Sequence, residues 1–185
     1  MTITPAGTEV AYTITYLEMT EAPAPAPALP EDVRLERCEQ PPVWFFLSLY
    51  DAVGRMYEWV DKFNEAPEAV QAFVQHPDVV LYVAYRHGWP AGFFQLDWRE
   101  PGVCDLAYFG LVPEAIGGGI GGTLLRSAIA TGWSRDDVMK MTVNTCTLDH
   151  PRALDLYKRV GFQPVRTEDH TRVLIRDRDP SQFPA

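Results

Sequence analysis

Residues 111–125 read LVPEAIGGGIGGTLL, and this stretch decides how the rest of the chain is interpreted. Five glycines fall within six residues, between a strand-like segment that stops before Pro113 and an amphipathic segment at residues 123–130. Glycine leaves backbone N–H groups open to a ligand, and a helix start adds unpaired N–H donors with a partial positive charge. The stretch therefore predicts an anion site suited to phosphate, because a flexible linker does not usually run straight into an amphipathic helix.

Gly117, Gly119 and Gly122 also satisfy the dinucleotide pattern G-x-G-x-x-G, which is weak on its own. A dinucleotide-binding domain requires a parallel sheet built from strand–helix–strand units after the loop. Here one clear strand and one helix follow, and the strands before the loop are joined by short turns typical of antiparallel hairpins. The Gly-Lys-Ser/Thr of a P-loop is missing as well. Both interpretations therefore fail on context.

Hydrophobic patterns on both sides of the loop predict an α/β (α+β) fold. Three strands separated by Gly/Pro turns precede the loop, and two helices precede those strands. Beyond the loop we expect a helix, a strand, a helix that stops at Gly161, and a closing hairpin that turns at residues 168–170. The expected strands are residues 79–86, 91–98, 103–112, 138–146, 162–166 and 171–176, and the expected helices are residues 43–53, 66–75, 121–133 and 151–160.

The N-terminal part contains a strand-like segment, residues 10–19, followed by an alternating Ala-Pro segment within residues 21–32. The Ala-Pro segment is expected to be extended and semi-rigid. A lone strand does not fold by itself, so the first strand must either join the sheet or pair with another chain. The second arrangement would favour a homodimer.

The composition is that of a globular protein with an acidic excess. Of its 185 residues, 46% are hydrophobic and 22% are charged, and the net charge is −9. Residues 1–110 carry 6 Lys/Arg and 16 Asp/Glu, whereas residues 111–185 carry 10 and 9. The chain therefore lacks the basic footprint that nucleic acid requires, and it has no apolar run long enough for a membrane span. Its acidic half would attract a cation, or its acidic residues simply keep the protein soluble.

Three scattered cysteines, Cys38, Cys104 and Cys146, have neither the spacing of metal ligands nor the even number of a disulfide framework. The first ten residues show no basic stretch followed by an apolar run. We therefore expect no metal site and a reducing, cytoplasmic location.

A second motif occupies residues 150–162, which read HPRALDLYKRVGF. It resembles the Asn-x-x-Ala-x-x-x-Tyr-x-x-x-Gly-Phe helix of the GNAT N-acetyltransferase superfamily, with His150 where Asn is usual. Residues 113–122 resemble the acetyl-CoA signature of the same superfamily, in which Arg or Gln is followed by x-x-Gly-x-Gly/Ala. Lining up the glycines puts Gly119 and Gly121 on the motif and Ile116 where Arg or Gln is usual. The resemblance covers roughly residues 33–176 and is specific for superfamily and cofactor.

The resemblance implies the GNAT fold, a mixed, mostly antiparallel sheet with a V-shaped splay between the central strands and helices on both faces. Acetyl-CoA would lie with its pantetheine in the splay, paired with backbone groups like a short extra strand. The domain would span residues 33–178, with residues 1–32 as strand and arm and residues 179–185 as tail. The implied cofactor-binding residues are Leu111, Val112, Ile116, Gly117, Gly118, Gly119, Ile120, Gly121, Gly122 and Thr123.

The resemblance also implies direct attack of an amine on the thioester in a ternary complex. Tyr157 stands where family members often use a tyrosine as general acid toward the sulfur of CoA, although its helical spacing would suit a core residue too. Asp105 matches the general-base glutamate of the histone acetyltransferase branch, or is an outward-facing strand residue. His150 is a second candidate base, or a capping or surface residue near the helix start.

The acceptor is expected to be a small molecule with a primary amine and a cationic character, because the acidic balance favours a cation. Tyr57, Glu58 and Trp59 lie in the region that usually lines the acceptor pocket in this superfamily, and an aromatic wall with an acid suits a cation. The alternative function is an acyl-CoA-binding module without turnover. Ile116 is compatible with that alternative, whereas Tyr157 and Asp105 favour an enzyme.

Overall fold

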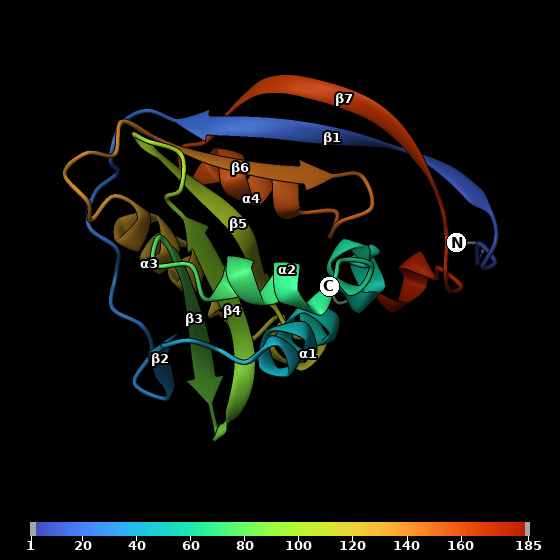
Figure 1. Ribbon diagram of the computed structural model, residues 1–185, viewed down its shortest axis with the longest axis horizontal. Coiled ribbons are helices and arrows are strands. Elements are labelled where there is room, and N and C mark those ends of the chain that lie inside the picture. The colour runs from blue at the N-terminus through green and yellow to red at the C-terminus, as the bar shows by residue number, and fades with distance from the viewer. Residues whose placement is uncertain (1–2, 184–185) are drawn as a thin grey trace.

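The computed structural model describes residues 3–183, which fold around one seven-stranded sheet (Figure 1). The strand order is β2-β3-β4-β5-β6-β1-β7. Neighbouring strands are antiparallel except for β5 and β6, which are parallel. The strands are β1 (Glu9–Met19), β2 (Val33–Cys38), β3 (Val79–Arg86), β4 (Trp89–Asp97), β5 (Val103–Leu111), β6 (Lys140–Cys146) and β7 (Gln163–Val173).

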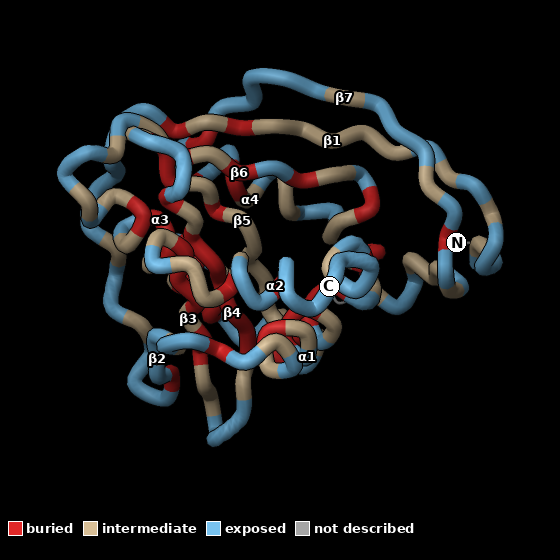
Figure 2. Tube along the Cα trace, viewed as in Figure 1, coloured by how far each residue is buried: buried red, intermediate tan, exposed pale blue. Residues whose placement is uncertain are grey.

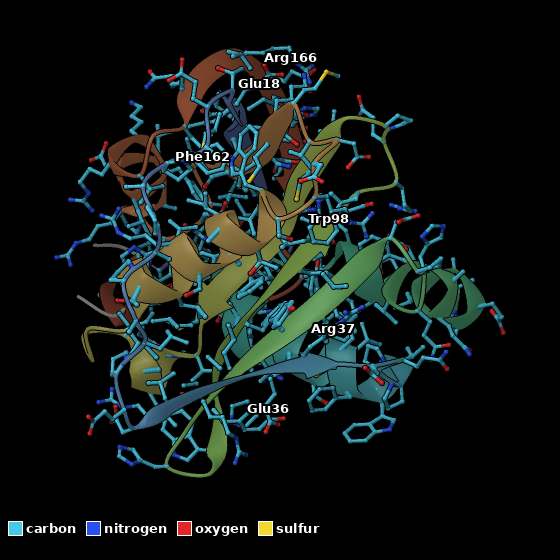
Figure 3. All side chains as sticks on the ribbon, turned by 90° about the vertical axis from the view of Figure 1, so that its left-hand side faces the viewer. Glu18, Glu36, Arg37, Trp98, Phe162 and Arg166 are labelled. Carbon is cyan, nitrogen blue, oxygen red and sulfur yellow. The ribbon has the colours of Figure 1, made fainter. Side chains whose placement is uncertain are left out.

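Helices cover both faces of the central strands. On one face, Phe46 of α1 contacts Phe93 of β4 and Tyr108 of β5. On the other, Trp98 donates its indole N–H to the carbonyl of Gly132, the last residue of α3, at 3.1 Å (Figure 3). None of the helices within residues 3–183 is long and apolar enough to cross a membrane. The α-helices are α1 (Val43–Gly54), α2 (Pro67–Val74), α3 (Gly121–Gly132) and α4 (Ala153–Arg159).

The hydrophobic core is concentrated in the half of the sheet that contains β3 and β4 (Figure 2). Leu81, Phe93 and Phe94 are completely buried there, as are Leu124 and Leu125 of α3. At the opposite edge, β7 is exposed along almost its whole length. The burial pattern therefore places the packed scaffold on one side of β5 and a thin, solvated extension on the other.

The parallel pairing of β5 with β6 is very short. It joins Val103 to Lys140, Cys104 to Met141 and Asp105 to Thr142, and it stops there although both strands continue. Ala107 is skipped in the pairing of β5 with β4, which is a β-bulge that bends the strand just beyond this point. The predicted fold class is confirmed, including the splay between the two central strands.

The first strand joins the sheet rather than a second chain. β1 pairs with β6 on one side, from Ile14 to Met19, and with β7 on the other, from Glu9 to Glu18. Leu17 at its centre is completely buried. The segment that the sequence set apart as an N-terminal strand is thus an interior strand, and the reason to expect a homodimer is removed.

Two expectations for the secondary structure are wrong. The closing hairpin does not form, because residues 168–170 pair with Ile14, Thr13 and Tyr12 of β1 and continue one long strand. Because β1 pairs with β7 along nearly its whole length, the chain continues straight through these residues and does not turn back. Residues 33–38, for which no strand was expected, form the edge strand β2, where Glu36 and Arg37 lie on neighbouring positions (Figure 3). The other strands and helices lie within a few residues of their expected ranges.

Candidate active site

A cavity of about 420 Å³ opens between the diverging parts of β5 and β6. Its wall comes from the second half of β5, the Gly-rich loop, the end of β6 with the turn that follows it, α4, and the end of α1 with the segment between α1 and α2. The cavity exists because β5 and β6 do not pair beyond Asp105 and Thr142. Both sequence motifs, the Gly-rich loop and the helix of residues 153–159, therefore meet at one hollow.

The Gly-rich loop turns alternate residues toward and away from this cavity. Gly117 and Gly119 line it, and both have φ of +80°, a conformation that favours glycine. A Cβ atom added at either position would find no other atom within 4 Å, so the space in front of them is open. Gly121 and Gly122, the first residues of α3, also line the cavity. The loop thus offers backbone N–H groups and a helix N-terminus to the same space.

The structure brings together part of the predicted cofactor-binding set. Ile120 is completely buried in the core, and the N–H of Val112 donates to the carbonyl of Ala91 at 3.0 Å. Leu111, Ile116, Gly117, Gly119, Gly121 and Gly122 line the cavity, whereas Val112, Gly118, Ile120 and Thr123 are not among its lining residues.

Tyr157 lies in the wall of the cavity with 7% of its surface exposed. Its ring stands edge-on to Phe109 of β5 and to Phe162, with centroid distances of 6.4 and 6.1 Å. Burial raises the pKa of the phenol well above its ordinary value, and the charges of Asp149 and Asp105 raise it further. The hydroxyl is protonated at neutral pH, as it would be at the ordinary pKa of a phenol, and the shift makes the phenolate still less favourable.

Asp105 lies at the vertex of the splay, on the last residue pair between β5 and β6. Its carboxylate accepts a hydrogen bond of 2.6 Å from the hydroxyl of Thr142. Burial raises the pKa of this carboxyl, the Thr142 hydrogen bond opposes the rise, and the charges of Asp97 and Glu100 add to it. Asp105 itself is not a lining residue of the cavity, which begins at the next residue, Leu106.

The bulge at Ala107 puts Asp105 and Tyr108 on the same face of the sheet. Asp105 stands opposite Asp97, and Tyr108 stands opposite Gln95, two residues earlier on β4. Tyr108 lines the cavity, and burial raises the pKa of its phenol. Tyr108 and Gln95 thus share a face of the sheet with Asp105.

His150 lies in the cavity wall, in the turn before α4. Its Nδ1 accepts the backbone N–H of Arg152 at 3.1 Å. The ring stands edge-on to Tyr57 at a centroid distance of 6.0 Å. In the neutral ring an accepting Nδ1 leaves the proton on Nε2, so His150 presents an N–H rather than a lone pair to its other neighbours.

A hydrogen bond crosses the open end of the splay. The indole N–H of Trp59, between α1 and α2, donates to Asp149 Oδ1 at 3.1 Å. The other oxygen of Asp149 accepts from the Thr145 hydroxyl at 2.7 Å and from the Cys146 N–H at 2.9 Å. No local pattern in the sequence singles out Asp149, because its partner Trp59 lies 90 positions away.

Two polar side chains near the cavity are buried without a hydrogen-bond partner among residues 3–183. One is the hydroxyl of Tyr57, which is 7% exposed and lines the cavity. The other is the amide of Gln95, completely buried, with neither its oxygen nor its nitrogen bonded. Unbonded buried groups are costly, so a bound molecule or ordered water is expected beside them. Within the described residues no three His, Cys, Asp or Glu side chains are grouped as metal ligands.

A family model described as "Acetyltransferase (GNAT) family" matches residues 17–162. No curated protein matches the chain. Among solved structures, a GCN5-related N-acetyltransferase from Sphaerobacter thermophilus is 18% identical with a TM-score of 0.60 and covers 94% of this chain and 53% of its own. The first such structures extend well beyond this chain, which spans 53 to 64% of their length.

Two further solved structures share the fold. A GNAT-family acetyltransferase structure from Novosphingobium aromaticivorans is 17% identical with a TM-score of 0.59 and covers 94% of this chain and 72% of its own. An aminoglycoside acetyltransferase from an uncultured soil metagenomic sample, solved with sisomicin, is 17% identical with a TM-score of 0.51. The match covers 70% of this chain and 87% of that one.

The raised pKa of Asp105 predicts a pH-dependent stability. Folding favours its protonated form, so its contribution to stability is fully present below the unfolded-state pKa of about 3.9 and is lost as pH rises through the folded-state pKa. Asp105→Asn, which keeps an acceptor for Thr142, should therefore increase the free energy of unfolding at neutral pH. Urea denaturation should show this gain shrinking to nothing at acidic pH. The exposed Asp136→Asn is the control, and a destabilised Asp105→Asn at neutral pH would contradict the argument.

Proposed function

Because the chain belongs to the acetyltransferase (GNAT) family, we propose that it is an N-acetyltransferase that moves an acetyl group from acetyl-CoA to a primary amine of a small molecule. The observation that carries the proposal is the cavity in the splay, where the Gly-rich loop and Tyr157 line one space. Acetyl-CoA would supply a thioester that an amine attacks directly. The residues of the cavity would bind it, orient it and handle two protons.

The Gly-rich loop fits the anionic end of this cofactor. Gly117 and Gly119 leave open space in front of their backbone, and the N-terminus of α3 faces the same cavity. Arg152 and Arg159 of the α4 segment also line the cavity and add positive charge. The residues present therefore suit a pyrophosphate.

The free edge of β5 fits the extended pantetheine arm. After Asp105 the strand has no pairing with β6, so backbone groups from Leu106 to Leu111 face the splay. An extended amide chain could pair with them as an added strand. Val112 contributes less, because its N–H and its carbonyl already bond to Ala91 and Ala115.

Tyr157 is proposed as the general acid. The phenol lines the cavity and is protonated at neutral pH, so it has a proton to give. From Oη it would give its proton to the sulfur that leaves when the thioester is broken. Its buried position in the cavity wall keeps water away from the leaving group.

Asp105 is proposed as the general base in preference to His150. Nδ1 of His150 already accepts a backbone N–H, whereas the carboxylate of Asp105 has a raised pKa, which suits it to accept a proton nearer neutral pH. Since Asp105 does not line the cavity, the proton would pass through water. The unbonded amide of Gln95 and the hydroxyl of Tyr108 lie on the same face and would order that water.

The acceptor is proposed to be a cationic small-molecule amine. On the acceptor side the cavity is lined by the aromatic rings of Tyr57, Trp59 and Tyr108, and Asp149 adds a carboxylate. An aminoglycoside acetyltransferase shares the fold, which supports a small polar amine as the substrate class. Three free thiols, Cys38, Cys104 and Cys146, support the proposed cytoplasmic location.

The competing function is an acyl-CoA-binding module without turnover. Purified protein incubated with acetyl-CoA, a thiol reagent and a panel of amines separates the two. Amine-dependent release of free thiol supports the enzyme. Tight binding of CoA with no release for polyamine, amino-sugar and amino-acid-like acceptors would favour the module.

Gly119→Glu should abolish CoA binding while the protein remains folded. The new side chain fills the open space in front of the loop and puts a negative charge where phosphate would lie. Calorimetric titration with CoA measures the effect. Gly7→Glu is the matched control, since Gly7 has φ of +82°, equally open surroundings and no place in the cavity. Unchanged CoA affinity in folded Gly119→Glu would show that the anion site lies elsewhere.

Tyr157→Phe should lower kcat by roughly 10²–10⁴-fold with little change in CoA affinity, because only the hydroxyl of the proposed acid is lost. Steady-state kinetics with an accepted amine measures this. Tyr82→Phe is the control, since Tyr82 stacks on Phe94 outside the cavity wall. A kcat equal to that of the unmodified protein would make Tyr157 a packing residue only.

The rate–pH profile distinguishes the two candidate bases. Asp105→Asn should lower kcat/KM and remove from its acidic limb the inflection that a general base produces, because the variant depends on amine that is already neutral in solution and follows only the amine's own ionisation. His150→Gln should retain that inflection. The opposite pattern would transfer the role of base from Asp105 to His150.

A further inference from the structure

Arg86 is the basic side chain that contacts the Gly-rich loop, although it comes from a distant part of the sequence. It is the last residue of β3, and its Nη1 donates to the carbonyl of Gly118 at 3.1 Å. A Cβ atom at Gly118 would approach this nitrogen to 2.7 Å, so a larger residue there would displace the end of the Arg86 side chain. The position in the loop where Arg or Gln was expected is occupied by Ile116.

We infer that Arg86 is a positioning residue for the proposed pyrophosphate site, and that it fixes the direction in which the Gly119 N–H points. The inference rests on the proposed function. Arg86 acts on the main chain of the loop from the side away from the cavity, because Gly117 and Gly119 line the cavity and Gly118 does not. Arg86 therefore orders the loop from a different position than the Arg or Gln that Ile116 replaces.

The geometry of the peptide unit explains the effect. In a trans peptide the carbonyl of one residue and the N–H of the next point in opposite directions. Holding the Gly118 carbonyl toward Arg86 therefore directs the Gly119 N–H the other way, toward the cavity. Between two glycines a rotation of this peptide plane meets little steric resistance, and it would turn an oxygen toward the phosphates. The contact with Arg86 opposes that rotation.

Asp32 fixes Arg86 in turn. The Nε of Arg86 donates to Asp32 Oδ2 at 2.7 Å, where the Ala-Pro segment ends. This hydrogen bond lowers the pKa of Asp32, so the carboxylate is charged at neutral pH. The backbone hydrogen bonds of the loop are short-range: Gly118 N–H donates to Ala115 and Ile116 N–H to Pro113. Ile120 anchors the end of the loop in the core, and Asp32 and Arg86 add a hydrogen-bonded connection at Gly118.

The experiment compares a donor that has a pyrophosphate with one that lacks it. Arg86→Ala should weaken CoA binding roughly tenfold by calorimetry, which is the worth of one charged hydrogen bond. The same variant should leave kcat/KM with acetyl-pantetheine unchanged, because that donor has no pyrophosphate. The loss should persist at high salt, because it comes from loop geometry and not from long-range charge. Asp32→Ala, in an exposed segment, should weaken CoA binding in the same direction by a smaller factor, and it tests the inference even if Arg86→Ala folds poorly.

Arg34→Ala is the matched control, because Arg34 lies on the neighbouring strand opposite Tyr85, is 73% exposed and pairs with Glu36 rather than with the loop. It should leave CoA affinity unchanged. The inference is overturned if Arg86→Ala binds CoA normally, if Arg34→Ala weakens binding equally, or if high salt abolishes the difference. An equal loss with acetyl-pantetheine also overturns it. Failure of the unmodified protein to bind CoA at all would instead reject the proposed function on which the inference rests.

Discussion

Three residue pairs hold β5 and β6 together, and the rest of the structure depends on the pairing stopping there. Beyond that point each strand loses a neighbour, and the gap must be kept open without backbone hydrogen bonds across it. Side chains do this at the open end: Trp59 bonds to Asp149, and Arg178 donates to the carbonyls of Met56 and Leu148. The cavity is therefore held by a short stretch of sheet at one end and by side-chain contacts at the other.

The acidic excess of the chain is spread unevenly between paired and unpaired carboxylates. Asp61 and Asp97 form ion pairs with Arg172 and Arg99, so their charge is largely compensated where it stands. Within residues 3–183 the hydrogen-bond partner of the Asp105 carboxylate is the Thr142 hydroxyl, and the charges that shift its pKa are those of other acids. A carboxylate kept in such surroundings weakens the fold and gains basicity, which is the exchange expected of a group that must take up a proton. Ion pairing of individual carboxylates, more than the net charge of the chain, therefore determines the electrostatic character of the site.

Local signals in the sequence predicted the local features correctly. The glycine run, the helix that follows it and the strands bounded by Gly/Pro turns lie close to their expected ranges, because propensity and turn chemistry act over a few residues. Whether β1 joins the sheet or a second chain was left open, and the continuous β7 was missed, since strand pairing over the whole chain leaves no local trace. The same reason hid Arg86 and the partner of Asp149. Tyr157 and Asp105 were found only through a resemblance, and their roles remain proposals.

The place of β1 in the sheet also sets the order in which the protein can fold. Thr13 bonds to Asp169, 156 positions away, so β1 finds its partner β7 only after the strands and helices between them have been made. Until then a β-branched and aromatic segment stays without a sheet. Contacts of such sequence separation slow folding and leave strand edges exposed for longer. We expect the rate-limiting step of refolding to be the docking of β1 between β6 and β7. The segment from α1 to α3, which includes strands β3 to β5, would already have collapsed by then.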